Sequence, residues 1–231
     1  MRFVLTHSPL LGPLSWQAVR DQLAARGHEA RAPAWPRLAA MGSDFYARLA
    51  AGLSEQVGAG PPVMLVVHSG AGALAPALET ALASPVAGVI FVDAILPHPG
   101  LAWLDTAPPA LRADLHAGVQ DGLLPSWDDW WPPGALDRLV PDPQLRSAMT
   151  AELEPLPLAY FEEAAPEVGL SAPGAYLQLS GAYEDQAQMA RARGWPVRRL
   201  QLNHLSPLTA PREVAVMVEA LAREVLEAVD G

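Results

Sequence analysis

The chain has 231 residues, of which 51% are hydrophobic, and a formal net charge of −10. This length suits one domain with a sizeable core, and the acidic balance argues against nucleic acid as a partner, because phosphate binding needs basic clusters. The absence of cysteine excludes disulfides, thiolate nucleophiles and cysteine-based metal sites. No apolar run reaches the length of a membrane span, and the first residues show no signal-peptide pattern, so we expect no membrane partner and a cytoplasmic location.

The first half of the chain alternates between strand and helix patterns. Apolar runs predict strands at residues 2–6, 28–32, 63–67 and 86–92, and amphipathic spacing predicts helices at 16–26, 43–57 and 70–83. Ser43 or Asp44 is a candidate N-cap for the second of these helices. Strands that alternate with helices of this length form right-handed βαβ units, so the pattern predicts a parallel sheet.

The alternation stops at Pro97 and resumes near residue 174. The pattern of residues 98–173 predicts no strand and only short helices, separated by segments rich in proline and tryptophan. Strands at 175–180 and 197–202 and helices at 185–193 and 211–229 follow. We therefore predict an α/β core formed by residues 1–97 and 174–231, with residues 98–173 inserted as a cap over a sheet of about six parallel strands.

One predicted strand ends in a pattern typical of a nucleophilic serine. Residues 61–72 read PPVMLVVHSGAG, so a buried strand stops at His68 and Ser69 and is followed by small residues and a helical pattern. A serine on a sharp turn between strand and helix is a nucleophile elbow. The usual form is G-x-S-x-G, whereas Val67 and Ala71 stand here in place of the two glycines.

Other chemically active side chains also follow predicted strands. Asp93 comes after the strand at 86–92, Glu184 after 175–180, and His204 after 197–202. The carboxyl ends of parallel strands meet at one edge of a sheet, where the reactive crevice forms. The chain order is therefore nucleophile, acid and base, as in α/β-hydrolases.

With these positions the chain resembles the α/β-hydrolase superfamily, and specifically its small branch that includes plant methylesterases and hydroxynitrile lyases. Residues 6–16, THSPLLGPLSW, are similar to that branch's HG-x-x-x-G-x-x-x-W oxyanion loop, and HLSPL at 204–208 is similar to the segment around its catalytic histidine. The resemblance covers nearly the whole chain apart from the predicted cap. It implies an α/β-hydrolase fold and a cofactor-independent enzyme, with Ser69 as nucleophile and His204 as base.

Two carboxylates are candidates for the acid that orients His204. Glu184 lies in GAYE, which resembles the family's G-x-x-D, and Asp93 lies in FVDAI, which resembles the strand end that carries the acid in some haloalkane dehalogenases. We favour Asp93, because an acid at the tip of an apolar strand has no evident structural use. Glu184 stands in a polar run that a solvated loop explains.

The resemblance also implies an oxyanion hole, and here the sequence departs from the family. In this family, the backbone N–H two positions after the loop histidine donates a hydrogen bond to the oxyanion. Pro9 stands at that position here and has no N–H. The amide of Gly70 remains, and the hydroxyl of Ser8 or the amide of Ser8 or Leu10 is expected to replace the missing donor. Loss of one such donor typically costs roughly 10²–10³ in rate.

The predicted cap is rich in aromatic residues that could form an apolar pocket over Ser69. The expected pocket residues are Trp103, Trp127, Trp130, Trp131 and Tyr160. No two histidines have the i, i+4 spacing of a helical metal site and no glycine-rich nucleotide loop occurs, so we expect neither a metal nor a cofactor.

Two of the histidines have expected structural roles. His7 matches a family residue that orders the oxyanion loop by hydrogen bonding. His68 flanks the nucleophile and is expected to point away from the site.

The sequence supports three hypotheses on function. The first is a serine hydrolase that cleaves an ester, thioester or lactone with an apolar portion, a small-molecule substrate. The second, motivated by Pro9, is a lyase, epimerase or cyclase in which Ser69 and His204 transfer protons without an acyl-enzyme. The third is a ligand-binding protein with a silent triad, against which the intact order of serine, acid and histidine argues. No pattern predicts self-association.

Overall fold

A computed structural model describes residues 1–230, with side chains described as far as Ala228. Its main sheet has six parallel strands in the order β2-β1-β3-β4-β7-β8, which confirms the predicted parallel α/β architecture. The strands are β1 (Arg2–Thr6), β2 (Glu29–Arg31), β3 (Val63–His68), β4 (Val86–Val92), β7 (Gly174–Gln178) and β8 (Val197–Arg199).

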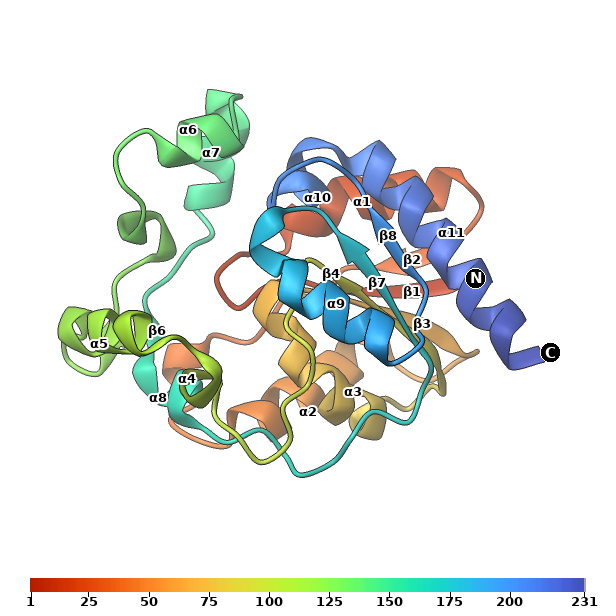
Figure 1. Cartoon of the computed structure of the whole chain (residues 1–231), viewed down its shortest axis with the longest axis horizontal. Helices are drawn as coiled ribbons and strands as arrows, with labels where there is room; N and C mark the ends of the chain where they lie inside the picture. Colours follow the sequence, from red (N-terminus) through yellow and green to blue (C-terminus); the bar gives the residue numbers. More distant parts are fainter. Residues whose placement is uncertain (231) are drawn as a thin grey trace.

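Helices cover both faces of this sheet (Figure 1). The central strands are apolar at nearly every position, and successive side chains point to opposite faces. Leu65, Phe91 and Tyr176 therefore pack in one core layer, and Val66, Val92 and Leu177 pack in the other. The first layer lies under α2 (Phe45–Val57), α3 (Ala75–Ala81) and α9 (Glu184–Ala192), and the second under α1 (Leu14–Ala25) and α11 (Pro211–Asp230). The short helix α10 (Ser206–Thr209) packs beside α1 and α11. No helix within residues 1–230 is both long and apolar enough to cross a lipid bilayer.

The helix predicted at residues 70–83 is divided in the structure. A 3₁₀ helix, η2 (Ser69–Leu74), follows β3 directly, and α3 begins only at Ala75. Pro76 causes this division, because proline lacks an N–H and fits an α-helix only in its first turn. The tighter η2 leaves Ser69 at the edge of the sheet.

Residues 98–173, which we call the insertion, lie between β4 and β7. Figure 1 shows the insertion, coloured from yellow-green to teal, beside the sheet. Its short strands β5 and β6 pair antiparallel, so the prediction of no strand in this segment was wrong. A strand of two residues is too short to give a periodic pattern. The elements are α4 (Trp103–Thr106), α5 (Pro109–Gly118), β5 (Leu123–Leu124), η3 (Trp127–Trp130), α6 (Ala135–Leu139), α7 (Pro143–Thr150), β6 (Leu156–Pro157) and α8 (Leu158–Glu162).

Carboxylates of the insertion cap two helices of the core. Asp44 occupies the N-cap position of α2, as predicted, but its side chain makes no capping hydrogen bond. The Glu163 carboxylate instead accepts hydrogen bonds from the N–H groups of Phe45 (2.9 Å) and Tyr46 (3.1 Å). Glu152 accepts one from the N–H of Leu14, at the start of α1 (3.0 Å). A carboxylate stabilises a helix N-terminus, because the first N–H groups have no acceptor inside the helix.

We expect Glu163→Ala to lower the free energy of unfolding by about 1–2 kcal/mol, because two N–H groups at the start of α2 lose their acceptor. Denaturant unfolding measures this change. Glu162→Ala is the matched control, since Glu162 is an exposed neighbour and its loss should change the free energy by less than about 0.5 kcal/mol. Equal stability of the two variants would contradict the capping role.

Candidate active site

Ser69 lies on a strained turn between β3 and η2. Its φ of +57° is in the left-handed region, which few residues other than glycine adopt. The backbone at position 72 lies so close to the segment after β4 that a Cβ there would collide with the carbonyl oxygen of Ile95. The structure therefore explains why position 72 requires glycine. This geometry is that of a nucleophile elbow.

The carboxylate of Asp93 is in contact with the imidazole of His204. Asp93 follows β4, is fully buried and also has a positive φ, of +42°. Its Oδ1 accepts the N–H groups of Leu179 (2.8 Å) and Ser180 (3.0 Å), and its Oδ2 accepts the Ser180 hydroxyl (2.6 Å) and lies 3.0 Å from His204 Nδ1. Burial alone would raise the pKa of Asp93, but the hydrogen bonds from His204 and Ser180 outweigh it and lower the pKa. Asp93 is therefore ionised at neutral pH and can hold His204 in one orientation.

Tyr183 is a member of this cluster that the sequence reasoning missed. Its hydroxyl lies 3.2 Å from Ser69 Oγ, and its ring stacks on His204 with a centroid separation of 5.0 Å and an interplanar angle of 5°. In the described part of the chain no hydrogen bond joins Ser69 to His204, and Tyr183 is the partner of Ser69 instead. Tyr183 ends the 3₁₀ helix η4 (Gly181–Tyr183). It stands one position before Glu184, which matches the acid of the family's G-x-x-D, and this position is the feature of the sequence that could have indicated its place in the site.

His68 also contacts His204, contrary to the prediction that it points away. Its Nε2–H donates to the carbonyl oxygen of His204 (3.0 Å), and the two rings lie 4.5 Å apart. Burial, together with the nearby His204, places the pKa of His68 well below its ordinary value. His68 therefore stays neutral and fixes the backbone of His204. β3 is buried at every position, His68 included, so the sequence of the strand does not indicate what this side chain contacts.

Two neighbouring cavities meet near Ser69. The inner pocket, of about 100 Å³, is lined in part by Ser69 and Gly70. The outer cavity, of about 500 Å³, opens beside α4 and α9. Ile95, Trp103 and Tyr183 line both spaces and therefore stand between them. The remaining residues of the inner pocket are Pro9, Leu10, Tyr46, Ala73, Tyr160 and Phe161.

Comparison with known proteins identifies the fold. No family model matches the chain, and no curated protein matches it. Among solved structures, an extracellular α/β-hydrolase from a Paenibacillus species, homologous to tobacco salicylic acid binding protein 2, aligns with 95% of this chain and 98% of its own at 19% identity and a TM-score of 0.76.

Two further solved structures agree. A pyrethroid hydrolase from Sphingobium faniae JZ-2 is 21% identical, with 96% of this chain and 97% of its own covered and a TM-score of 0.67. Tomato methylketone synthase I is 15% identical, with 97% and 98% covered and a TM-score of 0.71. The chain has the α/β-hydrolase fold.

Within this α/β-hydrolase fold, the two candidate acids differ in their surroundings. Glu184 is half-exposed and pairs with Arg191 (3.6 Å) and Arg199 (3.4 Å) at the surface. Its carboxylate also accepts from the amide of Gln178 (2.9 Å). Of the two candidate carboxylates, only Asp93 contacts His204.

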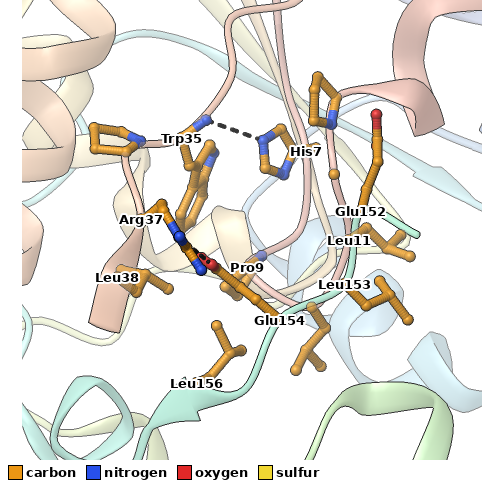
Figure 2. A pocket seen from close by; sticks show the side chains of 14 residues that line it. His7, Pro9, Leu11, Trp35, Arg37, Leu38, Glu152, Leu153, Glu154 and Leu156 are labelled. Carbon is orange, nitrogen blue, oxygen red and sulfur yellow. Dashed lines mark hydrogen bonds and ion pairs between the residues drawn. The ribbon is translucent and has the colours of Figure 1, made fainter. Parts of the chain in front are cut away.

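The loop after β1 is held by His7. The Nδ1–H of His7 donates to the carbonyl of Ser8 (2.7 Å), and its Nε2 accepts the N–H of Trp35 (3.2 Å), which confirms the predicted ordering role. Figure 2 shows the bond to Trp35 at the edge of a separate pocket of about 180 Å³, which an ion pair between Arg37 and Glu154 crosses. Ser69 does not line this pocket, so the loop separates it from the site.

The structure places the predicted pocket aromatics in two groups. Trp103 and Tyr160 line the inner pocket, as expected. Trp127, Trp130 and Trp131 do not line it. Trp127 and Trp131 belong to another apolar cluster, and Trp130 packs against both that cluster and the main core. Trp127 and Trp131 pack edge to face, 5.3 Å apart, against Leu205, Leu208 and the start of α1. These tryptophans join the insertion to the core, a role that their spacing in the sequence could not distinguish from pocket lining.

The described residues contain no group of three or more histidine, aspartate or glutamate side chains that could hold a metal ion. The chemistry available at the edge of the sheet is that of Ser69, His204, Asp93 and Tyr183.

Proposed function

We propose that the protein is a cofactor-independent serine hydrolase that cleaves a carboxylic ester, thioester or lactone. The observation that carries this proposal is the Asp93–His204 pair beside a serine held at a left-handed φ. Parallel strands bring these three side chains to one sheet edge from positions far apart in the chain. Neighbours of the same fold include a pyrethroid hydrolase and a polyneuridine aldehyde esterase, which supports ester chemistry.

In this reaction Ser69 Oγ attacks the carbonyl carbon and its proton passes to His204 Nε2. Asp93 keeps the Nδ1–H of His204 in place and stabilises the imidazolium that forms. The carbonyl oxygen becomes an oxyanion, for which the amide of Gly70, a residue that lines the inner pocket in the first turn of η2, is the proposed donor. The leaving group departs with the proton from His204, and water then hydrolyses the acyl-enzyme by the same steps.

The two cavities indicate how the substrate is divided. The inner pocket of about 100 Å³ is smaller than a cavity of roughly 150 Å³ that admits benzene, which suits a short acyl group. The outer cavity of about 500 Å³ is lined mainly by apolar side chains and suits a larger apolar portion. We therefore propose a substrate with a short acyl group and a larger apolar remainder, and the insertion as the cap that encloses it.

Intact-mass analysis after treatment with a fluorophosphonate tests the proposed nucleophile. We expect one adduct, which peptide mapping places on Ser69 and which Ser69→Ala lacks. Turnover is then followed with p-nitrophenyl esters of increasing acyl length, for which the inner pocket predicts a preference for short chains. A folded protein that forms no adduct and hydrolyses no ester would overturn the proposal.

Pro9 favours a second candidate, a lyase, epimerase or cyclase in which Ser69 and His204 transfer protons. A proton-transfer enzyme needs no full oxyanion hole, and the fold alone does not fix the reaction. Mass spectrometry under substrate turnover separates the two candidates. An acyl group trapped on Ser69 supports the hydrolase, and turnover without any covalent intermediate supports the second candidate.

A further inference from the structure

The loop after β1 has few N–H groups left for an oxyanion. Pro9 has none, and its ring packs against Gly70. The N–H of Leu10 donates to the hydroxyl of Ser8 (3.2 Å), and the N–H of Leu11 donates to the carbonyl of Ser8 (3.1 Å). Ser8 does not line the inner pocket, although Pro9 and Leu10 do. The Leu10 amide is therefore engaged by Ser8, and neither the hydroxyl nor the amide of Ser8 lies at the pocket, so the loop offers Gly70 no partner donor.

The hydroxyl of Tyr183 lies where such a donor is needed. The Tyr183 hydroxyl is 3.2 Å from Ser69 Oγ. When Oγ bonds to the carbonyl carbon of a substrate, the carbonyl oxygen comes within hydrogen-bonding reach, about 3 Å, of this hydroxyl. The stack on His204 holds the ring in this position. Tyr183 also lines the inner pocket together with Gly70.

We propose that the Tyr183 hydroxyl is the second hydrogen-bond donor to the reacting carbonyl oxygen, in place of the loop amide that Pro9 removes. This inference rests on the proposed hydrolase function and assigns a catalytic residue to it.

The reaction step then proceeds as follows. The bound carbonyl oxygen accepts the hydrogen bond of the Tyr183 hydroxyl, which then no longer bonds to Ser69 Oγ. Ser69 Oγ can therefore give its proton to His204 Nε2. As the Oγ–C bond forms, the electron pair of the carbonyl π bond moves to the oxygen, which accepts hydrogen bonds from Tyr183 and Gly70. When this intermediate collapses, the electron pair returns, the bond to the leaving group breaks, and the leaving group takes the proton from His204. Tyr183 keeps its own proton throughout.

The electrostatics of the site agree with a donor role. Burial raises the pKa of Tyr183 to about 12, and the nearby Asp93 raises it further, against the opposite effect of the hydrogen bond with Ser69. Tyr183 is therefore protonated at neutral pH and acts as a donor, not as a base.

Tyr183→Phe tests the proposal, because it removes only the hydroxyl and keeps the ring that stacks on His204. We expect kcat for p-nitrophenyl acetate and for an unactivated alkyl ester to fall by a similar factor of about 10². Affinity for a trifluoromethyl ketone, which forms a tetrahedral adduct on Ser69, should fall in parallel, while KM changes less than about threefold. A merely structural role would not produce this parallel loss.

Other outcomes of the same experiment would overturn the proposal. Unchanged or faster turnover would show that Tyr183 only restrains Ser69. A loss confined to the alkyl ester would show that the hydroxyl assists the leaving group instead. Wild-type turnover is measured first, so the absence of any ester hydrolysis would count against the proposed function, whereas normal wild-type turnover with an unaffected variant would count against Tyr183 alone.

Two further variants complete the test. Glu184→Gln changes the adjacent residue, which faces solvent, and should leave kcat within about twofold. Pro9→Ala, made together with Tyr183→Phe, returns an N–H to the loop, and we expect it to recover about tenfold of the lost kcat. Failure of Pro9→Ala to recover activity would contradict the idea that Tyr183 replaces the loop donor.

Discussion

Ser69→Ala and His204→Ala are each expected to lower kcat for ester hydrolysis by about 10⁶-fold, with no further loss when they are combined. The two side chains act on the same proton, so removal of either one stops nucleophilic attack. Steady-state kinetics on p-nitrophenyl acetate with the single and double variants measure this non-additivity. Losses that multiply in the double variant would show that the two residues act independently.

Both variants should fold as the parent does. Alanine keeps the Cβ of Ser69 and therefore the same backbone strain at φ +57°. His204 is partly exposed, so its truncation opens no large cavity in the core. Circular dichroism and thermal unfolding provide the check, and full activity in a folded variant would remove that residue from the mechanism.

Asp93→Asn is expected to lower kcat by about 10⁴-fold. The carboxylate accepts from two backbone N–H groups, from Ser180 and from His204. An amide presents only one acceptor oxygen, so its NH₂ group would face a donor and favour the wrong tautomer of His204.

Glu184→Gln is the matched control for the acid. It makes the same chemical change at the other candidate carboxylate, where we expect less than about a twofold effect. Kinetics on both variants, with thermal unfolding as the test of folding, decide between them. A large loss with Glu184→Gln and none with Asp93→Asn would reverse the assignment.

The places of Ser69, Asp93 and His204 at the ends of strands could be predicted from the sequence, because they follow from the order in which strands and helices are connected. Alternating strands and helices predict a parallel sheet, and a parallel sheet brings Ser69, Asp93 and His204 to one edge whatever the details of the loops. The choice of Asp93 over Glu184 rested on the apolar strand before it, and the structure places only Asp93 against His204.

The contacts that depend on side-chain direction in turns were not predictable. Tyr183 lies in a short 3₁₀ turn, and no periodicity indicates which way its ring points. The aromatic run at Trp127–Trp130 predicts burial but not the surface it packs against. The caps of α1 and α2 come from glutamates more than 100 residues away in the chain, whereas local patterns predict only local caps.

The origin of these caps limits how a substrate can enter. An outward rotation of the insertion would break the hydrogen bonds by which Glu152 and Glu163 cap the N-termini of α1 and α2. The loss of each cap would cost about 0.5–2 kcal/mol of free energy. It would also break the tryptophan packing against Leu205 and Leu208. The insertion therefore behaves as part of the folding unit and not as an exchangeable module. We therefore expect access to Ser69 to depend on rotation of Ile95 and Trp103, which stand between the two cavities, more than on motion of the whole insertion.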